Sequence, residues 1–343
     1  MRAIERAPYF ASVWLPVLLA SAGAAEPGAA QKAVVDAYAA QVINAKVVCD
    51  DAGNVTRLAV SNHPAFRKDK SSPPPPGIDD QDFAKILELP RLEAIALERQ
   101  PLGDASYALL GRLKGLRDVR LHYVGSQTGS GGQATPDFPL FVNELPGLQV
   151  LELKHCFSIK GGCMEKLKPQ AELLKLEIDT GYAGSSAVPF IVAAKKLRNL
   201  QIHRTTMTDA DLQAICAALP ELEVLLIRPA NQRGEKRITG SSLRHLKACS
   251  KLRVLVLGLE WGALPYEGGL DALAAMPSLK QVSLAPSDIK DFGMDDPAVR
   301  KLREARPDLL IRVGSQTAGG VEGQTWEQED AEWNWDGGVT THG

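Results

Sequence analysis

One short apolar pattern recurs along most of this chain at nearly constant spacing. It reads Leu-x-x-Φ-x-Φ, where Φ is an aliphatic residue, and successive copies start roughly 25 residues apart, a period typical of solenoid proteins. A single repeat of this length cannot bury its own leucines, so neighbouring repeats must stack to form a continuous core. The copies begin at Leu92, Leu116, Leu148, Leu173, Leu197, Leu222, Leu252 and Leu279.

Each repeat predicts one strand followed by one helix. The end of each apolar pattern alternates apolar and other residues, as a strand with one buried face does. The segments between the patterns favour helices at 104–113, 209–219, 240–248 and 268–275, and Thr208 is a typical capping residue before the second of these. A strand and a helix in every repeat, with no room for separate domains, predict a parallel α/β solenoid.

This pattern resembles the leucine-rich repeat superfamily, in its helix-containing form called cysteine-containing or ribonuclease-inhibitor-like. Residues 148–156 follow the strand motif L-x-x-L-x-L-x-x-C through Cys156, and residues 238–252 are similar to the passage from one strand to the next. The resemblance covers about residues 79–313. It implies a right-handed, horseshoe-shaped α/β solenoid with parallel strands on the concave face and helices on the convex face. Most repeats depart from the motif by lacking the Asn or Cys after the strand.

The segments around the repeats have different roles. Residues 1–25 follow the order of a secretory signal peptide, with Arg2 and Arg6 before a short apolar run and small residues at the expected cleavage site. Residues 26–62 predict an N-terminal helix, a capping hairpin and the first strand, and 63–78 a proline-rich linker or insertion. Residues 79–313 hold the repeats and a C-terminal cap. The chain is therefore expected to be extracytoplasmic, either periplasmic or secreted, with no membrane span after signal cleavage.

Residues 314–343 form an acidic tail. It contains acids but no Lys or Arg, and it holds Trp326, Trp333 and Trp335. Low hydrophobicity and one sign of charge predict a disordered tail. The alternative is a short docking motif that becomes ordered on binding a partner.

Composition and motifs exclude several classes of function. Lys and Arg number 39 against 41 Asp and Glu, so the basic excess of a nucleic-acid binder is absent. The sequence has no zinc-protease, nucleophile-elbow or dinucleotide-binding motif. We therefore expect no metal, no cofactor, no nucleic acid and no enzymatic activity; the sequence does not indicate an oligomeric state.

The cysteines fit a buried role. The five cysteines have no C-x-x-C spacing, and free cysteine behaves as a small buried hydrophobe. We expect most of them to be core thiols. A disulfide between Cys156 and Cys163 is the alternative, because connectivity cannot be deduced from sequence.

Strand register predicts two rows of side chains on the concave face. The insertions at 124–136, 229–237 and 258–267 are expected to lie along one loop rim beside this face, and Trp261 belongs to that rim. The two rows and Trp261 are the predicted partner-binding residues. A mixed charged and apolar face suits a protein or peptide partner. The alternative is that the ion pairs within these rows form a solvated surface network with no role in binding. The first row is Arg120, Glu152, Glu177 and Gln201, and the second is His122, Lys154, Asp179, His203 and Arg228.

The sequence thus favours a non-catalytic binding module for a protein or peptide. The alternative is a hydrolytic or metal-dependent enzyme in which Asp179 orients His203 as a base. That alternative is weaker, because no Ser or Cys occupies a neighbouring position in the row.

Signal cleavage is testable directly. We expect the chain exported by its native host to begin at Ala25 or Glu26, because small residues precede that point. Intact-mass analysis of the exported protein measures this. Recovery of a form that retains Met1 would contradict it.

Overall fold

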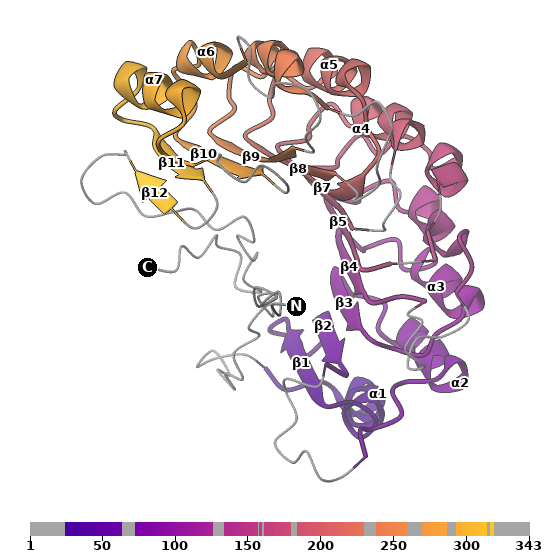
Figure 1. Ribbon diagram of the computed structural model, residues 1–343. Coiled ribbons are helices and arrows are strands. Elements are labelled where there is room, and N and C mark those ends of the chain that lie inside the picture. The colour runs from indigo at the N-terminus through magenta and orange to yellow at the C-terminus, as the bar shows by residue number, and fades with distance from the viewer. Residues whose placement is uncertain are drawn as a thin grey trace, which may run out of the picture.

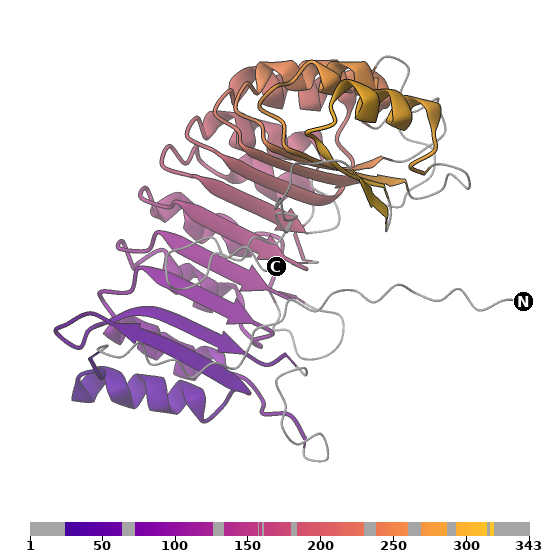
Figure 2. The same ribbon diagram turned by 90° about the vertical axis from the view of Figure 1, so that its left-hand side faces the viewer.

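The computed structural model describes residues 25–63, 73–125, 134–156, 158–159, 161–179, 184–229, 238–259, 269–286, 293–313 and 316–318. These residues form one continuous sheet that curves into an arch, with the helices along its outer side (Figure 1). A view turned by 90° shows the strands lying one after another along the arch (Figure 2). The α/β solenoid expected from the repeat, with strands inside and helices outside, is confirmed.

The sheet contains 12 strands in the order in which the chain visits them. Neighbours from β2 to β11 pair in parallel, whereas the terminal strands β1 and β12 pair antiparallel. The strands are β1 (Asn44–Cys49), β2 (Val55–Ser61), β3 (Ala94–Glu98), β4 (Asp118–His122), β5 (Val150–Lys154), β6 (Lys175–Asp179), β7 (Asn199–Thr205), β8 (Val224–Pro229), β9 (Val254–Leu259), β10 (Gln281–Pro286), β11 (Leu310–Val313) and β12 (Gln316–Ala318).

The outer layer mixes α-helices with 3-10 helices. Residues 240–248, predicted as a helix, form a 3-10 helix, whose three-residue turn directs Leu243 and Leu246 to the same side. The α-helices are α1 (Ala29–Ala39), α2 (Asp80–Phe83), α3 (Asp104–Leu110), α4 (Val188–Ala193), α5 (Asp209–Ala218), α6 (Gly269–Ala274) and α7 (Pro297–Ala305). The 3-10 helices are η2 (Ala84–Glu88), η3 (Phe138–Glu144), η4 (Gly161–Lys166), η5 (Ser185–Ala187) and η6 (Gly240–Ala248).

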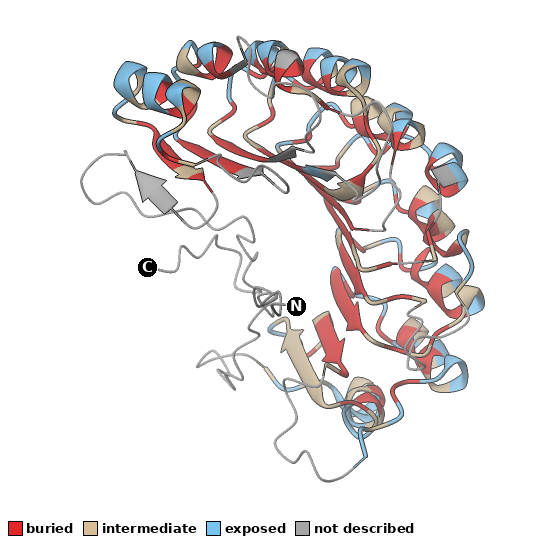
Figure 3. Cartoon of the chain, viewed as in Figure 1, coloured by how far each residue is buried: buried red, intermediate tan, exposed pale blue. Residues whose placement is uncertain are grey.

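The repeated leucines fill the space between the sheet and the outer layer. All eight leucines that begin the apolar pattern, from Leu92 to Leu279, are fully buried. Exposed residues gather on the outward side of the helices, and buried residues follow the strands (Figure 3). Stacked repeats therefore share one continuous core, as the spacing of the leucines predicted.

Both ends of the sheet are closed by antiparallel strands. The expected capping hairpin is present, because β1 pairs with β2, and Tyr38 of α1 donates a hydrogen bond of 3.0 Å to the carbonyl of Phe83. At the other end, β12 pairs with β11, so the sheet continues beyond the boundary expected at residue 313. The acidic tail after residue 318 lies outside the described residues, as does the signal segment 1–24.

The end of the proline-rich segment is anchored to the first repeats. The backbone N–H of Gly77 donates to the carbonyl of Gln41 at 3.0 Å, and that of Ile78 donates to the Gln100 side chain at 2.9 Å. Residues 64–72 of the expected linker lie outside the described residues.

The cysteines are core residues, as expected. All five are free thiols, including Cys156 and Cys163, and only Cys49 is not fully buried. Cys156 donates from Sγ to the carbonyl of Leu121 at 3.3 Å, which satisfies its thiol beneath the turn after β5. Burial raises the pKa of the Cys163 thiol to about 11.

Thiol reactivity should follow this burial. In the folded chain we expect an alkylating reagent to label Cys49 first and the other four cysteines slowly, because the thiolate is the nucleophile and burial suppresses it. In denaturant all five should react quickly. Mass spectrometry after timed labelling measures the rates, and detection of two disulfides would contradict the assignment.

Candidate partner-binding surface on the concave face

The strands bring both predicted rows together on the concave face. In the first row Arg120, Glu152, Glu177 and Gln201 are direct neighbours on β4 to β7. In the second, His122, Lys154, Asp179 and His203 are neighbours on the same strands. The placement of these residues follows from register, since a period of two puts alternate side chains on one face.

The second row does not continue regularly to Arg228. The pairing of β7 with β8 shifts between Ile202 and Thr205, and no pair joins His203 to Arg228. Arg228 is nevertheless exposed near the end of β8. Trp261 and most of the three predicted insertions lie outside the described residues.

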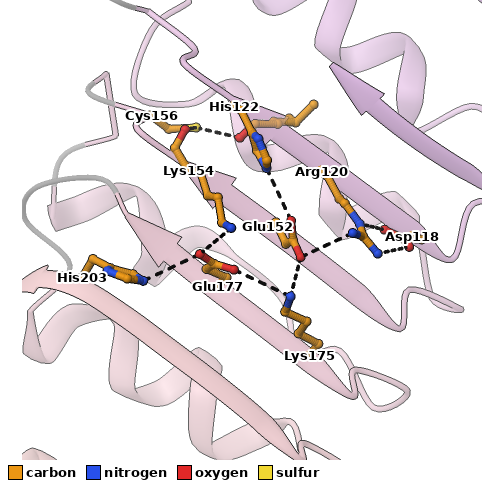
Figure 4. Close-up of polar contacts among 10 residues, drawn as sticks. Asp118, Arg120, His122, Glu152, Lys154, Cys156, Lys175, Glu177 and His203 are labelled. Carbon is orange, nitrogen blue, oxygen red and sulfur yellow. Dashed lines mark hydrogen bonds and ion pairs between the residues drawn. The ribbon is translucent and has the colours of Figure 1, made fainter. Parts of the chain in front are cut away.

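Ion pairs connect these rows into one network (Figure 4). At its centre, Glu152 lies 2.5 Å from Lys175 Nζ and 3.8 Å from Arg120 Nη1. Arg120 also donates two hydrogen bonds of 2.9 Å to the carboxylate of Asp118. Glu177 lies 3.1 Å from Lys154 Nζ.

Two histidines lie at the edges of the same network. The Nε2 atom of His122 is 3.4 Å from Glu152, and that of His203 is 3.6 Å from Glu177. Glu177 also lies 3.7 Å from Lys175. Each carboxylate at the centre therefore faces more than one cation or histidine on the adjacent strands.

The centre of the network is buried, so the interpretation as a solvated surface network is wrong. Glu152, Lys175 and Glu177 are each 2% exposed. Burial alone would raise the pKa of Glu152, but Lys175 and Arg120 hold that pKa well below its usual value. Paired in this way, the charges form a fixed floor to the concave face, while Lys154 and His203 at 19% and 15% side-chain exposure remain accessible.

Sequence reasoning missed two members of this floor. Lys175 and Asp118 form part of a third row, two residues before the first one on their strands. The sequence did contain a sign of this row: Lys175 and Asp118 lie two residues before Glu177 and Arg120, and alternate residues of a strand face the same side of the sheet. The row was not recognised because its other members include apolar Ala94 and Val150.

A line of left-handed residues was also missed. Arg99, Tyr123, His155 and Arg204 have φ between 53° and 60°, and each follows the second-row position of its strand. We call these four residues the left-handed ridge. If each strand continued in the extended conformation, the side chains of these four residues would point into the core. The left-handed conformation turns them away from the core instead. For a residue other than glycine it costs roughly 1–2 kcal/mol.

The ridge contacts the network through Asp179. The carboxylate of Asp179 lies 3.1 Å from His155 Nδ1 and 3.3 Å from Arg204 Nε. Burial lowers the pKa of His155, and the nearby Asp179 opposes that shift. Asp179 is thus engaged by the ridge, while His203 Nε2 lies 3.6 Å from the carboxylate of Glu177.

Buried apolar residues lie on one side of the charged centre, and a hollow lies on the other. Leu226, Val254 and Val256 form a small cluster on β8 and β9 that is separate from the main core. At the opposite end, a hollow above β1 to β4 includes Ala59, Ala96, Glu98 and His122 in its lining. The concave face is therefore charged in the middle and apolar or small toward its ends.

Comparisons with known proteins concern the fold alone. No protein-family model and no curated protein matches the chain. It is similar to a solved protein of Bacteroides fragilis, with 15% identity, 70% of each chain covered and a TM-score of 0.40. It is also similar to an internalin from Listeria monocytogenes, with 12% identity, 85% of this chain and 96% of that chain covered, and a TM-score of 0.29. The fold class rests on the sheet order and the repeat, not on these likenesses.

The repeat, the sequential parallel sheet and the leucine core define an α/β solenoid of the leucine-rich-repeat type. Folds of this kind generally act as scaffolds that bind proteins on an extended concave surface. In the part of the chain that the structure describes, no helix is long and apolar enough to cross a membrane. The same residues contain no cluster of His, Cys, Asp or Glu that could hold a metal ion.

The central ion pair gives a stability prediction. Lys175→Met leaves Glu152 as a buried charge with fewer partners, and we expect a loss of roughly 3–5 kcal/mol in the free energy of unfolding. Urea denaturation at neutral pH measures it. Lys196→Met is the matched control, because its ion pair with Glu172 is exposed and worth less than about 1 kcal/mol.

The same variant has a predicted pH dependence. The folded pKa of Glu152 is depressed, so its contribution is present above the ordinary glutamate pKa and is lost as pH falls through the folded pKa. Without Lys175, protonation of Glu152 relieves the buried charge. The difference in stability between wild type and Lys175→Met should therefore shrink at acid pH, and a constant difference would contradict the pairing.

Proposed function

We propose that this protein is an exported, non-catalytic binding module that holds a protein or peptide partner against its concave face and one loop rim. The observation that carries the proposal is the buried ion-pair network centred on Glu152 and Glu177. Such a network holds the accessible side chains around it in one arrangement before a partner arrives. Preorganisation of this kind favours binding, because less conformational entropy is lost on association.

The accessible residues around the floor are the proposed contacts. Lys154 and His203 belong to the network but are partly exposed, and Arg228 is exposed near the end of β8. Arginine and tryptophan are enriched among residues that dominate binding energy, which keeps Arg228 and Trp261 in the proposal. The buried members, Arg120, His122, Glu152, Glu177, Asp179 and Gln201, support these contacts rather than supplying most of them.

The finer family assignment is also part of the proposal. We propose a ribonuclease-inhibitor-like or cysteine-containing repeat in an extracytoplasmic protein. Its support is Cys156, which is fully buried and donates to the carbonyl of Leu121 at the position where the resembled motif ends in cysteine. The catalytic alternative has less support, because the carboxylate of Asp179 already contacts His155 and Arg204, at 3.1 and 3.3 Å.

Site-specific crosslinking tests the binding face. A photoreactive amino acid at Arg228 or Lys154 should capture the same partner from exported material of the native host, whereas one at Arg112 on the outer layer should not. With that partner purified, Arg228→Ala combined with Trp261→Ala should raise Kd at least about tenfold. Equal capture from Arg112, or an unchanged Kd for the folded double variant, would contradict the proposal.

A further inference from the structure

The side chains of the left-handed ridge form one continuous row of contacts along the rim of the arch, in which the first three side chains are stacked and the last contact is a hydrogen bond. The guanidinium of Arg99 lies 3.9 Å from the centre of the Tyr123 ring. The Tyr123 ring stacks on that of His155, with centroids 4.5 Å apart. His155 in turn lies 3.3 Å from Nη2 of Arg204.

This row of contacts is maintained against the local preference of the backbone. Glycine adopts positive φ without strain, and the chain uses it at Gly53, Gly77 and Gly125. On the ridge it places large planar side chains instead. The turn keeps the strands paired, since the N–H groups of Arg99 and Tyr123 still donate to carbonyls of the next strand, at 3.0 and 2.8 Å. Glycine would preserve those bonds, so the backbone does not require these side chains. Strained positions of this kind cluster at functional sites.

Arg99 carries a hydrogen-bond donor that the fold does not satisfy. Its Nε is buried and has no acceptor among the described residues, and no ion pair joins Arg99 to a carboxylate there. The adjacent Glu98 accepts a hydrogen bond of 2.6 Å from Ser61 Oγ. Arg99 as a whole is only half-buried, so a carboxylate from outside could pair with the accessible part of its guanidinium.

We propose that the left-handed ridge binds an extended acidic peptide segment of the partner, with one carboxylate at Arg99 and another at Arg204. The inference rests on the proposed binding function and names the chemistry of the partner. Arg204 is reachable, because its side chain is 37% exposed. The ring edges of Tyr123 and His155 lie between the two arginines.

The distance between the two guanidiniums sets the length of the segment. The strands β3 and β7, which carry Arg99 and Arg204, are four spacings apart in the sheet. At about 4.8 Å per spacing the backbones at the two arginines are roughly 19 Å apart, but the contacts of 3.9, 4.5 and 3.3 Å along the ridge bring the two guanidiniums to within roughly 13 Å of each other. An extended peptide advances about 3.3 Å per residue, so acidic residues about four positions apart would meet both arginines. Nucleic acid fits less well, because its affinity depends on many phosphate contacts and the chain has a net charge of -2.

The test uses a defined probe and the full chain. The probe is a fluorescent, end-blocked five-residue peptide with glutamate at positions 1 and 5 and serine or alanine between them. We expect Arg99→Gln and Arg204→Gln each to raise its Kd at least fivefold in low salt, measured by fluorescence anisotropy. Arg112→Gln removes the same charge from the outer layer and should leave the Kd unchanged. A probe with glutamine at both positions should bind no better to wild type than to the double variant.

A glycine variant separates binding from folding. Arg99→Gly removes the side chain but keeps the left-handed turn, so its denaturation midpoint should equal or exceed that of wild type while probe binding falls. A purely structural role for Arg99 would instead lower the midpoint and leave the Kd unchanged. That result would overturn the proposal.

Other outcomes are equally decisive. Equal binding of the probe to wild type and to Arg99→Gln/Arg204→Gln overturns the acidic-peptide site, as does tighter binding of a single-stranded oligonucleotide that depends on the same arginines. If the partner crosslinked at Arg228 binds that double variant with unchanged Kd, the ridge inference fails and the proposed function stands. If no partner crosslinks on the concave face but the glutamate probe binds through both arginines, the wider function fails instead.

Discussion

Burial of aliphatic side chains between the sheet and the outer helices is the interaction on which the rest of this arch depends. A strand–helix unit of roughly 25 residues leaves its leucines half covered until the next unit packs against it, so the units must stack in chain order. Leu151, Leu176 and Leu200 show the result: they are paired neighbours on β5 to β7 and are fully buried. Because that core sets the register, it also decides which side chains become neighbours on the opposite, concave face.

On the concave face, the alignment of the strands places opposite charges next to the buried carboxylates of Glu152 and Glu177. Removing a carboxylate from water is unfavourable unless opposite charges surround it, and the adjacent strands supply them. Glu152 lies between Arg120 and Lys175, and Glu177 between Lys175 and Lys154. Arg120, Glu152 and Lys175 are distant in sequence and meet only because the leucines beneath their strands are aligned. The outcome is a rigid floor, and a surface held in one arrangement is suited to recognition rather than to structural support alone.

In the left-handed ridge the unfavourable contribution comes from the backbone conformation rather than from buried charge. Continuing the strand would direct Arg99, Tyr123 and His155 toward the aliphatic core. The left-handed turn avoids that burial, and stacking between the side chains recovers part of its cost. The pairing of the strands does not need these side chains, whereas an acidic segment lying along the rim would. Strain in the fold and specificity in binding would then have the same origin.

The sequence by itself determined the architecture and the two main concave rows. Leucine spacing specifies a stacked α/β solenoid, and a period of two specifies that Glu152 and Glu177 share a face, because both are local properties of the chain. Tertiary structure alone decided how those residues are used. Burial of the network depends on distances between strands, and the row fails at Arg228 because the pairing of β7 and β8 shifts. The ridge was invisible to pattern analysis, since parity assigns Tyr123 and His155 to the core and only the folded backbone shows them turned outward into contact with each other.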